Sequence, residues 1–125
     1  MTPTQRTLAA MREKGRVCGI VEKFNRFVGA HGIRQDLFGF LDILAIDPVD
    51  GIIGIQSCGS SFSEHVRKIE GELPPEAVEF LKHAQAELWG WRKVKLKRGG
   101  KAERWTPRIA DIVLEEGKIK VRERK

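Results

Sequence analysis

Apolar and polar residues follow one another in the first half of the chain in a way that predicts one helix and then three strands. Residues 4–14 place Leu8 and Met11 on one helix face, and Gly15 is a residue type that ends helices. The segment 25–34 is mixed and contains glycines, so it is expected to be a loop. Three apolar runs of strand length are present, at residues 17–21, 42–46 and 52–56.

The second half of the chain predicts two helices followed by a β-rich tail. Helices are expected over residues 63–70 and 75–85, the latter with proline in its first turn. Strand alternation runs from Trp89 to Lys95. Helices that flank a mixed central sheet, with a β-rich basic C-terminal extension, fit one α/β domain over residues 1–125. Further strands are predicted at residues 105–114 and 118–122.

Positive charge is concentrated in the last third of the chain. The whole chain carries 23 Lys and Arg against 17 Asp and Glu, a net charge of +6. The segment from Glu87 to Lys125 alone holds 13 basic and 6 acidic residues, a net of +7. A one-sided basic surface is typical of a protein that binds a polyanion. Charge alone leaves open a solvated basic face that has no partner.

Composition also excludes several classes of protein. No apolar run reaches the roughly 18 residues that a membrane-spanning helix needs, and the first residues lack the apolar core of a signal peptide. We therefore expect a cytoplasmic protein with no membrane partner. The two cysteines, Cys18 and Cys58, match no zinc-binding spacing and are expected to be buried and reduced.

One group of polar residues stands at the ends of the buried strands. Asp42 opens the second apolar run, Gln56 closes the third, and Cys58 follows two positions later. If the two strands are neighbours, Asp42 and Gln56 lie close together, and Cys58 shares the face of Gln56. A carboxylate at the start of a buried strand needs a partner or an ion.

This arrangement resembles the core of the PD-(D/E)xK nuclease superfamily, especially the compact archaeal-type Holliday-junction resolvases, and is similar to small nuclease-like phage proteins. The resemblance covers about residues 4–70 and includes Gln5-Arg6-Thr7-Leu8, which is similar to the Glu-Arg-x-Leu pattern of the family's first helix. It implies a restriction-endonuclease-like αβββαβ core. It also implies a Mg²⁺ or Mn²⁺ cofactor, cleavage of DNA that includes branched DNA, and a homodimer.

The family pattern carries over to this chain with substitutions. Asp42 matches the family's Asp, Gln56 its Glu, Cys58 its Lys, and Gln5 the Glu of its first helix. The resemblance therefore assigns metal binding to Asp42 and Gln56. Only Asp42 keeps its charge, and Mg²⁺ prefers carboxylate oxygens, so the substitutions weaken the expected metal site.

Other residues are candidates to replace the missing groups. A second carboxylate ligand is available from Asp36, Asp47 or Asp50, and a cation from Lys68 or Arg67 on the following helix. Asp47 and Asp50 also have the composition of a turn, in which they would bond their own backbone. Lys68 and Arg67 equally suit a solvated helix face.

Basic residues alternate with tryptophans near the end of the chain. Trp89, Trp91 and Trp105 are expected either to stack on bases or to lie in the core. The expected phosphate contacts are Arg67, Arg92, Lys93, Lys95, Lys97 and Arg98.

Three functions stay open for this chain: a metal-dependent endonuclease, a catalytically degenerate nuclease fold that binds nucleic acid, and a module that docks an acidic protein.

Overall fold

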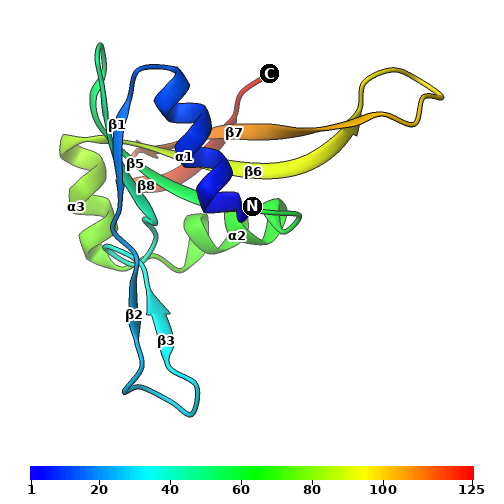
Figure 1. Cartoon of the computed structure of the whole chain (residues 1–125). Helices are drawn as coiled ribbons and strands as arrows, with labels where there is room; N and C mark the ends of the chain where they lie inside the picture. The colour runs from blue at the N-terminus through cyan, green and yellow to red at the C-terminus, as the bar shows by residue number, and fades with distance from the viewer.

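The computed structural model describes residues 1–125, which form a six-stranded sheet with helices on both faces and a separate two-stranded hairpin (Figure 1). The predicted mixed α/β fold with a mixed central sheet and three helices is confirmed. The helices are α1 (Pro3–Glu13), α2 (Phe62–Gly71) and α3 (Pro75–His83). The strands are β1 (Val17–Ile20), β2 (Lys23–Asn25), β3 (Ile33–Gln35), β4 (Ile43–Asp47), β5 (Gly51–Cys58), β6 (Gln85–Lys95), β7 (Glu103–Glu115) and β8 (Lys118–Glu123).

The large sheet has the strand order β1-β4-β5-β6-β7-β8. Only β5 and β6 run parallel, with Ile53 opposite Gln85 and Cys58 opposite Gly90. All other neighbouring strands are antiparallel. A parallel pair needs a long crossover connection, and here α2 and α3 form it across one face of the sheet.

Helix α1 covers the opposite face of the sheet (Figure 1). Its N-cap is Thr2, whose hydroxyl accepts a hydrogen bond from Gln5 N, while Gln5 Oε1 accepts one from Thr2 N. This reciprocal pair is a capping box that fixes where the helix begins. Leu8 and Met11 are buried, as predicted. They pack with Ile43, Ala45, Ile53, Ile55, Trp89 and Trp91.

A second core lies beneath α2 and α3. Phe62 and Ile69 of α2 and Ala77 of α3 are buried against this face of the sheet. Their neighbours include Leu41, Cys58, Leu88, Ala110, Ile112 and Ile119. None of the three helices is both long and apolar enough to cross a membrane.

Trp89 and Trp91 belong to the core beneath α1 and do not form a stacking surface. Both are almost fully buried. Trp91 Nε1 donates a hydrogen bond to Thr7 Oγ1 at 2.8 Å, so its one polar group is satisfied inside the protein. Trp105 differs, because 39% of its surface is exposed and the Arg6 guanidinium lies 3.9 Å from its ring centroid.

The prediction of a simple loop at residues 25–34 is wrong, because the two ends of this segment belong to strands. β2 and β3 pair with each other from Lys23 opposite Gln35 to Asn25 opposite Ile33. The chain reverses between them through glycines with positive φ, a conformation that suits a residue without Cβ. Strands of three residues give too weak a sequence pattern to be predicted. The hairpin stands clear of the helices and points away from the large sheet (Figure 1).

A second projection is formed by the ends of β6 and β7. These strands stay paired as far as Lys95 opposite Glu103 and extend together beyond the rest of the sheet (Figure 1). We call residues 92–104 the basic arm, because they carry 7 Lys or Arg and 1 Glu. All of them except Gly100 are exposed.

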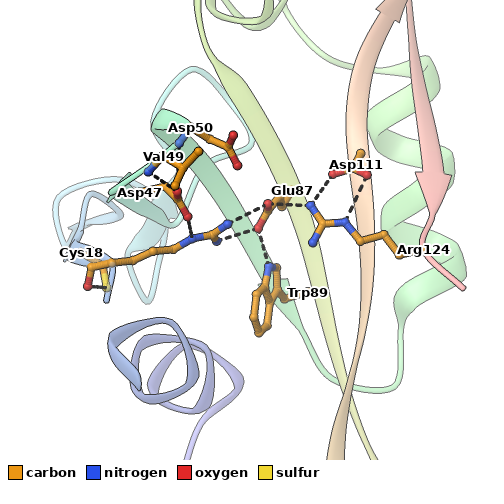
Figure 2. A network of polar contacts seen from close by, with 9 residues as sticks. Cys18, Asp47, Val49, Asp50, Glu87, Trp89, Asp111 and Arg124 are labelled. Carbon is orange, nitrogen blue, oxygen red and sulfur yellow. Dashed lines mark hydrogen bonds and ion pairs between the residues drawn. The ribbon is translucent and has the colours of Figure 1, made fainter. Parts of the chain in front are cut away.

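A buried network of ion pairs ties the two ends of the chain to the middle of the sheet (Figure 2). Arg16 donates to both carboxylate oxygens of Glu87, at 2.9 and 3.2 Å, and to Asp47 at 2.8 Å. Glu87 also accepts from Trp89 Nε1 at 2.9 Å and from Arg124 at 2.8 Å. Burial opposes ionisation of Glu87, but these donors outweigh it and lower the pKa of Glu87.

Replacing Glu87 with glutamine is expected to lower the free energy of unfolding by about 3 kcal/mol at pH 7, because Arg16 loses one of the two carboxylates that compensate its burial. The pKa of Glu87 lies below its ordinary value of 4.5 in the folded protein, so its stabilisation is present above pH 4.5 and is lost as the pH falls. Urea unfolding of both proteins from pH 7 to pH 3 should show the difference shrinking. Glu76→Gln, on the exposed surface of α3, is the control. A difference that does not change with pH would contradict the ion-pair explanation.

Candidate metal centre

Three carboxylates converge where the β2–β3 hairpin joins the sheet. Glu22 directly precedes β2, Asp36 directly follows β3, and Asp42 directly precedes β4. One oxygen atom of each lies within 4.8 Å of the others. We call Glu22, Asp36 and Asp42 the carboxylate cluster.

Three backbone links bring these residues together. The first pair of the hairpin, Lys23 opposite Gln35, places Glu22 beside Asp36. A bridge between Leu37 and Leu41 does the same for Asp36 and Asp42. Val21 N donates to Asp42 O at 2.9 Å and so joins Glu22 to Asp42. The cluster is therefore a product of backbone pairing and not of side-chain rotamers alone.

The turn between Leu37 and Leu41 has an unusual backbone. Phe38 and Gly39 both have positive φ, at 54° and 83°. A Cβ atom on Gly39 would lie 2.8 Å from Pro74 Cδ, so only glycine fits here without moving the α2–α3 connection. This tight turn lets two aspartates six positions apart meet.

Asp42 fills the gap where β4 and β5 separate. The pairing of these strands ends at Ile43 opposite Ile55, and beyond it Asp42 Oδ2 accepts from Ser57 N at 2.8 Å and from Ser57 Oγ at 3.2 Å. Burial raises the pKa of Asp42 to about 8, and the charges of Asp36 and Glu22 add to this shift, against the opposing Ser57 N–H. No cationic side chain forms an ion pair with Asp42 or Asp36.

Basic side chains line the space next to the cluster. An open pocket of about 660 Å³ is lined by Lys23, Arg34 and Asp36 together with apolar residues of the following turn. Arg34 Nε lies 3.4 Å from Glu22 Oε1, in an ion pair whose arginine is exposed. The site thus combines a negative centre with a positive rim.

The donor set fits a hard divalent cation. Mg²⁺ and Mn²⁺ are bound by carboxylate oxygens, often one or two with water completing the coordination. Glu22, Asp36 and Asp42 supply three such groups, and a cation would relieve their mutual repulsion. The cluster has no nitrogen or sulfur ligand, which argues against zinc.

The residues that the sequence assigned to the site differ in where they lie. Asp42 is in the cluster, and Asp36, one of the three candidate replacement carboxylates, joins it. Gln56 is only 9% exposed and does not hydrogen-bond to Asp42; its Oε1 is buried and accepts no hydrogen bond. Cys58 is buried in the core beneath α2, and burial, with the nearby Asp42 charge, raises the pKa of its thiol to about 11. An inert thiol cannot replace the family's lysine.

The remaining candidates have other contacts. Gln5 is occupied in the cap of α1 and not in a metal site. Asp47 pairs with Arg16 and accepts from the backbone of its own turn, where Asp50 is exposed. Lys68 and Arg67 are exposed on α2, and neither forms an ion pair with the cluster. The carboxylate cluster therefore has no lysine in the position that the nuclease resemblance predicted.

Sequence reasoning did not identify Glu22. It is the single acidic residue that directly follows the first apolar run, just as Asp42 directly precedes the second. That symmetry was the available signal. It becomes informative only once the intervening segment is known to be a hairpin that returns to its starting point.

The predicted phosphate-binding residues fall into two places. Arg92, Lys93, Lys95, Lys97 and Arg98 lie together on the basic arm, all exposed and without ion pairs. Arg67 lies apart from them on α2. Comparison of the chain with models of known protein families, with curated proteins and with solved structures finds no match.

Divalent cations are expected to stabilise the wild-type protein but not Asp42→Asn. At a Mn²⁺ concentration about ten times the Kd, linkage predicts a gain of ~1.4 kcal/mol, or a rise in Tm of about 3–6 °C. The proton on Asp42 competes with the ion, so the rise should increase as the pH approaches 8. Thermal unfolding with Mn²⁺ or EDTA measures this. Asp50→Asn, an exposed turn carboxylate, is the control, and equal shifts in all three proteins would contradict the site.

Proposed function

We propose that this protein is a metal-dependent nuclease that acts on DNA and has a restriction-endonuclease-like core. The observation that carries the proposal is the convergence of the carboxylate oxygens of Glu22, Asp36 and Asp42 within 4.8 Å of one another. The cationic side chains of Lys23 and Arg34 line the pocket beside them. Burial and two neighbouring carboxylates make the ionised form of Asp42 costly, so the cluster gains either a proton or a bound cation. Carboxylate-bound metals are a general device for phosphodiester hydrolysis.

The order of elements supports the same proposal. With the β2–β3 hairpin regarded as an insertion, α1, β1, β4, β5, the α2–α3 crossover and β6 follow the αβββαβ order of that superfamily. Asp42 stands at the start of the middle strand, as the resemblance implies. The family's carboxylate on the next strand is absent, and Asp36 and Glu22 from the hairpin base take its place in the proposal.

Each residue of the site has a distinct role in this scheme. A bound divalent ion would activate water and offset the charge that develops on the phosphate. Asp42, Asp36 and Glu22 would hold it, with Asp42 oriented by the two hydrogen bonds from Ser57. Lys23 and Arg34 at the rim would bind the phosphates on either side of the reacting one.

The basic arm would supply the general affinity for nucleic acid. Its 7 basic residues against 1 acidic residue lie on a paired, extended segment that the core does not cover. Phosphate contacts of this kind position a duplex without reading its sequence. The arm therefore favours a substrate that is defined by shape and not by base sequence.

A second function, nucleic-acid binding without cleavage, is favoured by one observation. The cluster has no lysine that matches the family's catalytic lysine, while the basic arm is intact. A nuclease fold that lost its chemistry and kept its affinity would have this combination. The two proposals predict different results in a cleavage assay.

Cleavage of labelled linear, single-stranded and four-way-junction DNA with Mg²⁺ or Mn²⁺ tests the nuclease proposal. Asp42→Ala and Asp36→Ala should each reduce the cleavage rate by at least about 100-fold, because both would remove a direct metal ligand. Asp50→Ala should retain activity, since Asp50 lies on an exposed turn outside the cluster. Binding without cleavage by any of these proteins would favour the binding module. Unchanged cleavage by Asp42→Ala would exclude the proposed site.

Removal of three charges from the arm should weaken DNA binding and its dependence on salt. The slope of log K against log[salt] is negative, and each phosphate contact contributes about −0.9 to it. The triple variant Lys95→Ala, Lys97→Ala, Arg98→Ala is therefore expected to make the slope less negative by about 2 to 3. Fluorescence anisotropy from 50 to 300 mM salt measures the slope. The control variant removes three exposed charges elsewhere, at Arg12, Lys82 and Lys118. Equal slopes for both triple variants would argue against the arm as the binding surface.

A further inference from the structure

The β2–β3 hairpin sorts its charges by position. Residues 23–35 contain Lys23, Arg26 and Arg34 and no acidic residue, whereas Glu22 and Asp36 stand immediately outside the two strands. Carboxylates therefore lie at the root of the hairpin and cations along its length. A polyanion that approaches the cluster meets a positive projection directly beside it.

The hairpin also presents aromatic rings to solvent. Phe27, at its tip, is 83% exposed, and the Arg26 guanidinium lies 5.0 Å from its ring centroid. Phe24 is exposed as well, although its ring rests against Gly32. β2 and β3 pair only with each other, and no helix covers them (Figure 1). Exposed apolar groups that gather on a projection in this way mark an interaction surface.

Local hydrogen bonding holds the tip in a defined shape. Asn25 Oδ1 accepts a hydrogen bond from Phe27 N at 3.0 Å, which fixes the turn that displays the ring. The glycines of the turn have positive φ and allow the chain to reverse within a few residues. The ring of Phe27 is thus displayed by an ordered turn and is not buried by it.

We propose that the tip of this hairpin stacks Phe27 on an unpaired base of the nucleic acid, at the opposite end of the hairpin from the carboxylate cluster. An aromatic ring beside arginine suits a nucleobase beside its phosphate, because the ring stacks on the base and the cation pairs with the backbone. Bases inside a duplex are already stacked on both faces, so apart from the two end pairs only an unpaired base offers a free face. This inference rests on the proposed function and specifies its substrate class as DNA with single-stranded or branched segments.

The test measures DNA binding and not cleavage, so its result does not depend on whether the protein cleaves DNA. Fluorescein-labelled probes are a 20-nucleotide single strand, a blunt duplex, and a duplex with a single-stranded fork, all in EDTA. Phe27→Ala should weaken binding to the single strand and the fork by about 5- to 100-fold and change binding to the blunt duplex by less than about 2-fold. Phe27→Trp, which keeps an aromatic face, should restore binding.

Matched controls separate stacking from other effects. Val49→Ala removes an equally exposed apolar group from the β4–β5 turn and should leave all three affinities unchanged. Circular dichroism and Tm should be the same for Phe27→Ala and the wild type, because the hairpin lies outside both cores. Equal loss on all three probes, or no loss on any, would overturn the inference. A wild-type dimer that dissociates in Phe27→Ala, with DNA binding unchanged, would instead make the tip a contact between two copies of the chain.

Discussion

The buried ion pair between Arg16 and Glu87 holds the sheet together across 71 positions of sequence. Arg16 lies just before the edge strand β1, and Glu87 lies on β6, two strands beyond β4 in the sheet. Asp47 and Arg124 extend the pair to the end of β4 and to the C-terminal residues. Charges out of water are tolerable only when each has partners. The network therefore joins the start of β1, the end of β4, strand β6 and the C-terminal residues, and β4 begins directly after Asp42.

Two buried carboxyl groups in this protein have pKa values shifted in opposite directions. The contrast distinguishes a carboxylate with a structural role from a candidate for a chemical role. Glu87 has hydrogen bonds from Arg16, Trp89 and Arg124, and its pKa is lowered. Asp42 has donors only from Ser57 and faces two further carboxylates, and its pKa is raised to about 8. The first site is complete within the protein. The second keeps a proton on Asp42 near neutral pH, and a strongly shifted pKa beside two further carboxylates makes this group the candidate for chemistry.

The periodicity of the sequence predicted the three helices and most strands of the large sheet, because each has an apolar face that the core must cover. It could not predict the hairpin, whose strands are three residues long and have no buried face. For the same reason it identified Asp42 and offered Asp36 as a candidate but did not find Glu22, which depends on that hairpin. Gln56 and Cys58 were assigned by resemblance, and Cys58 proved to be a core residue. Alternation alone could not decide whether Trp89 and Trp91 face solvent or α1.

The excess positive charge of the last third is divided between two structures. Part of it lies on the basic arm, and part on β8, which forms one edge of the large sheet and alternates Lys118, Lys120 and Arg122 with apolar residues. An open edge strand exposes unpaired backbone groups that can recruit a strand from another chain. Lysines and arginines along β8 repel an identical edge, so the same residues that raise the isoelectric point also guard the sheet against aggregation. The opposite edge, β1, is only four residues long, which limits the same hazard by length instead of charge.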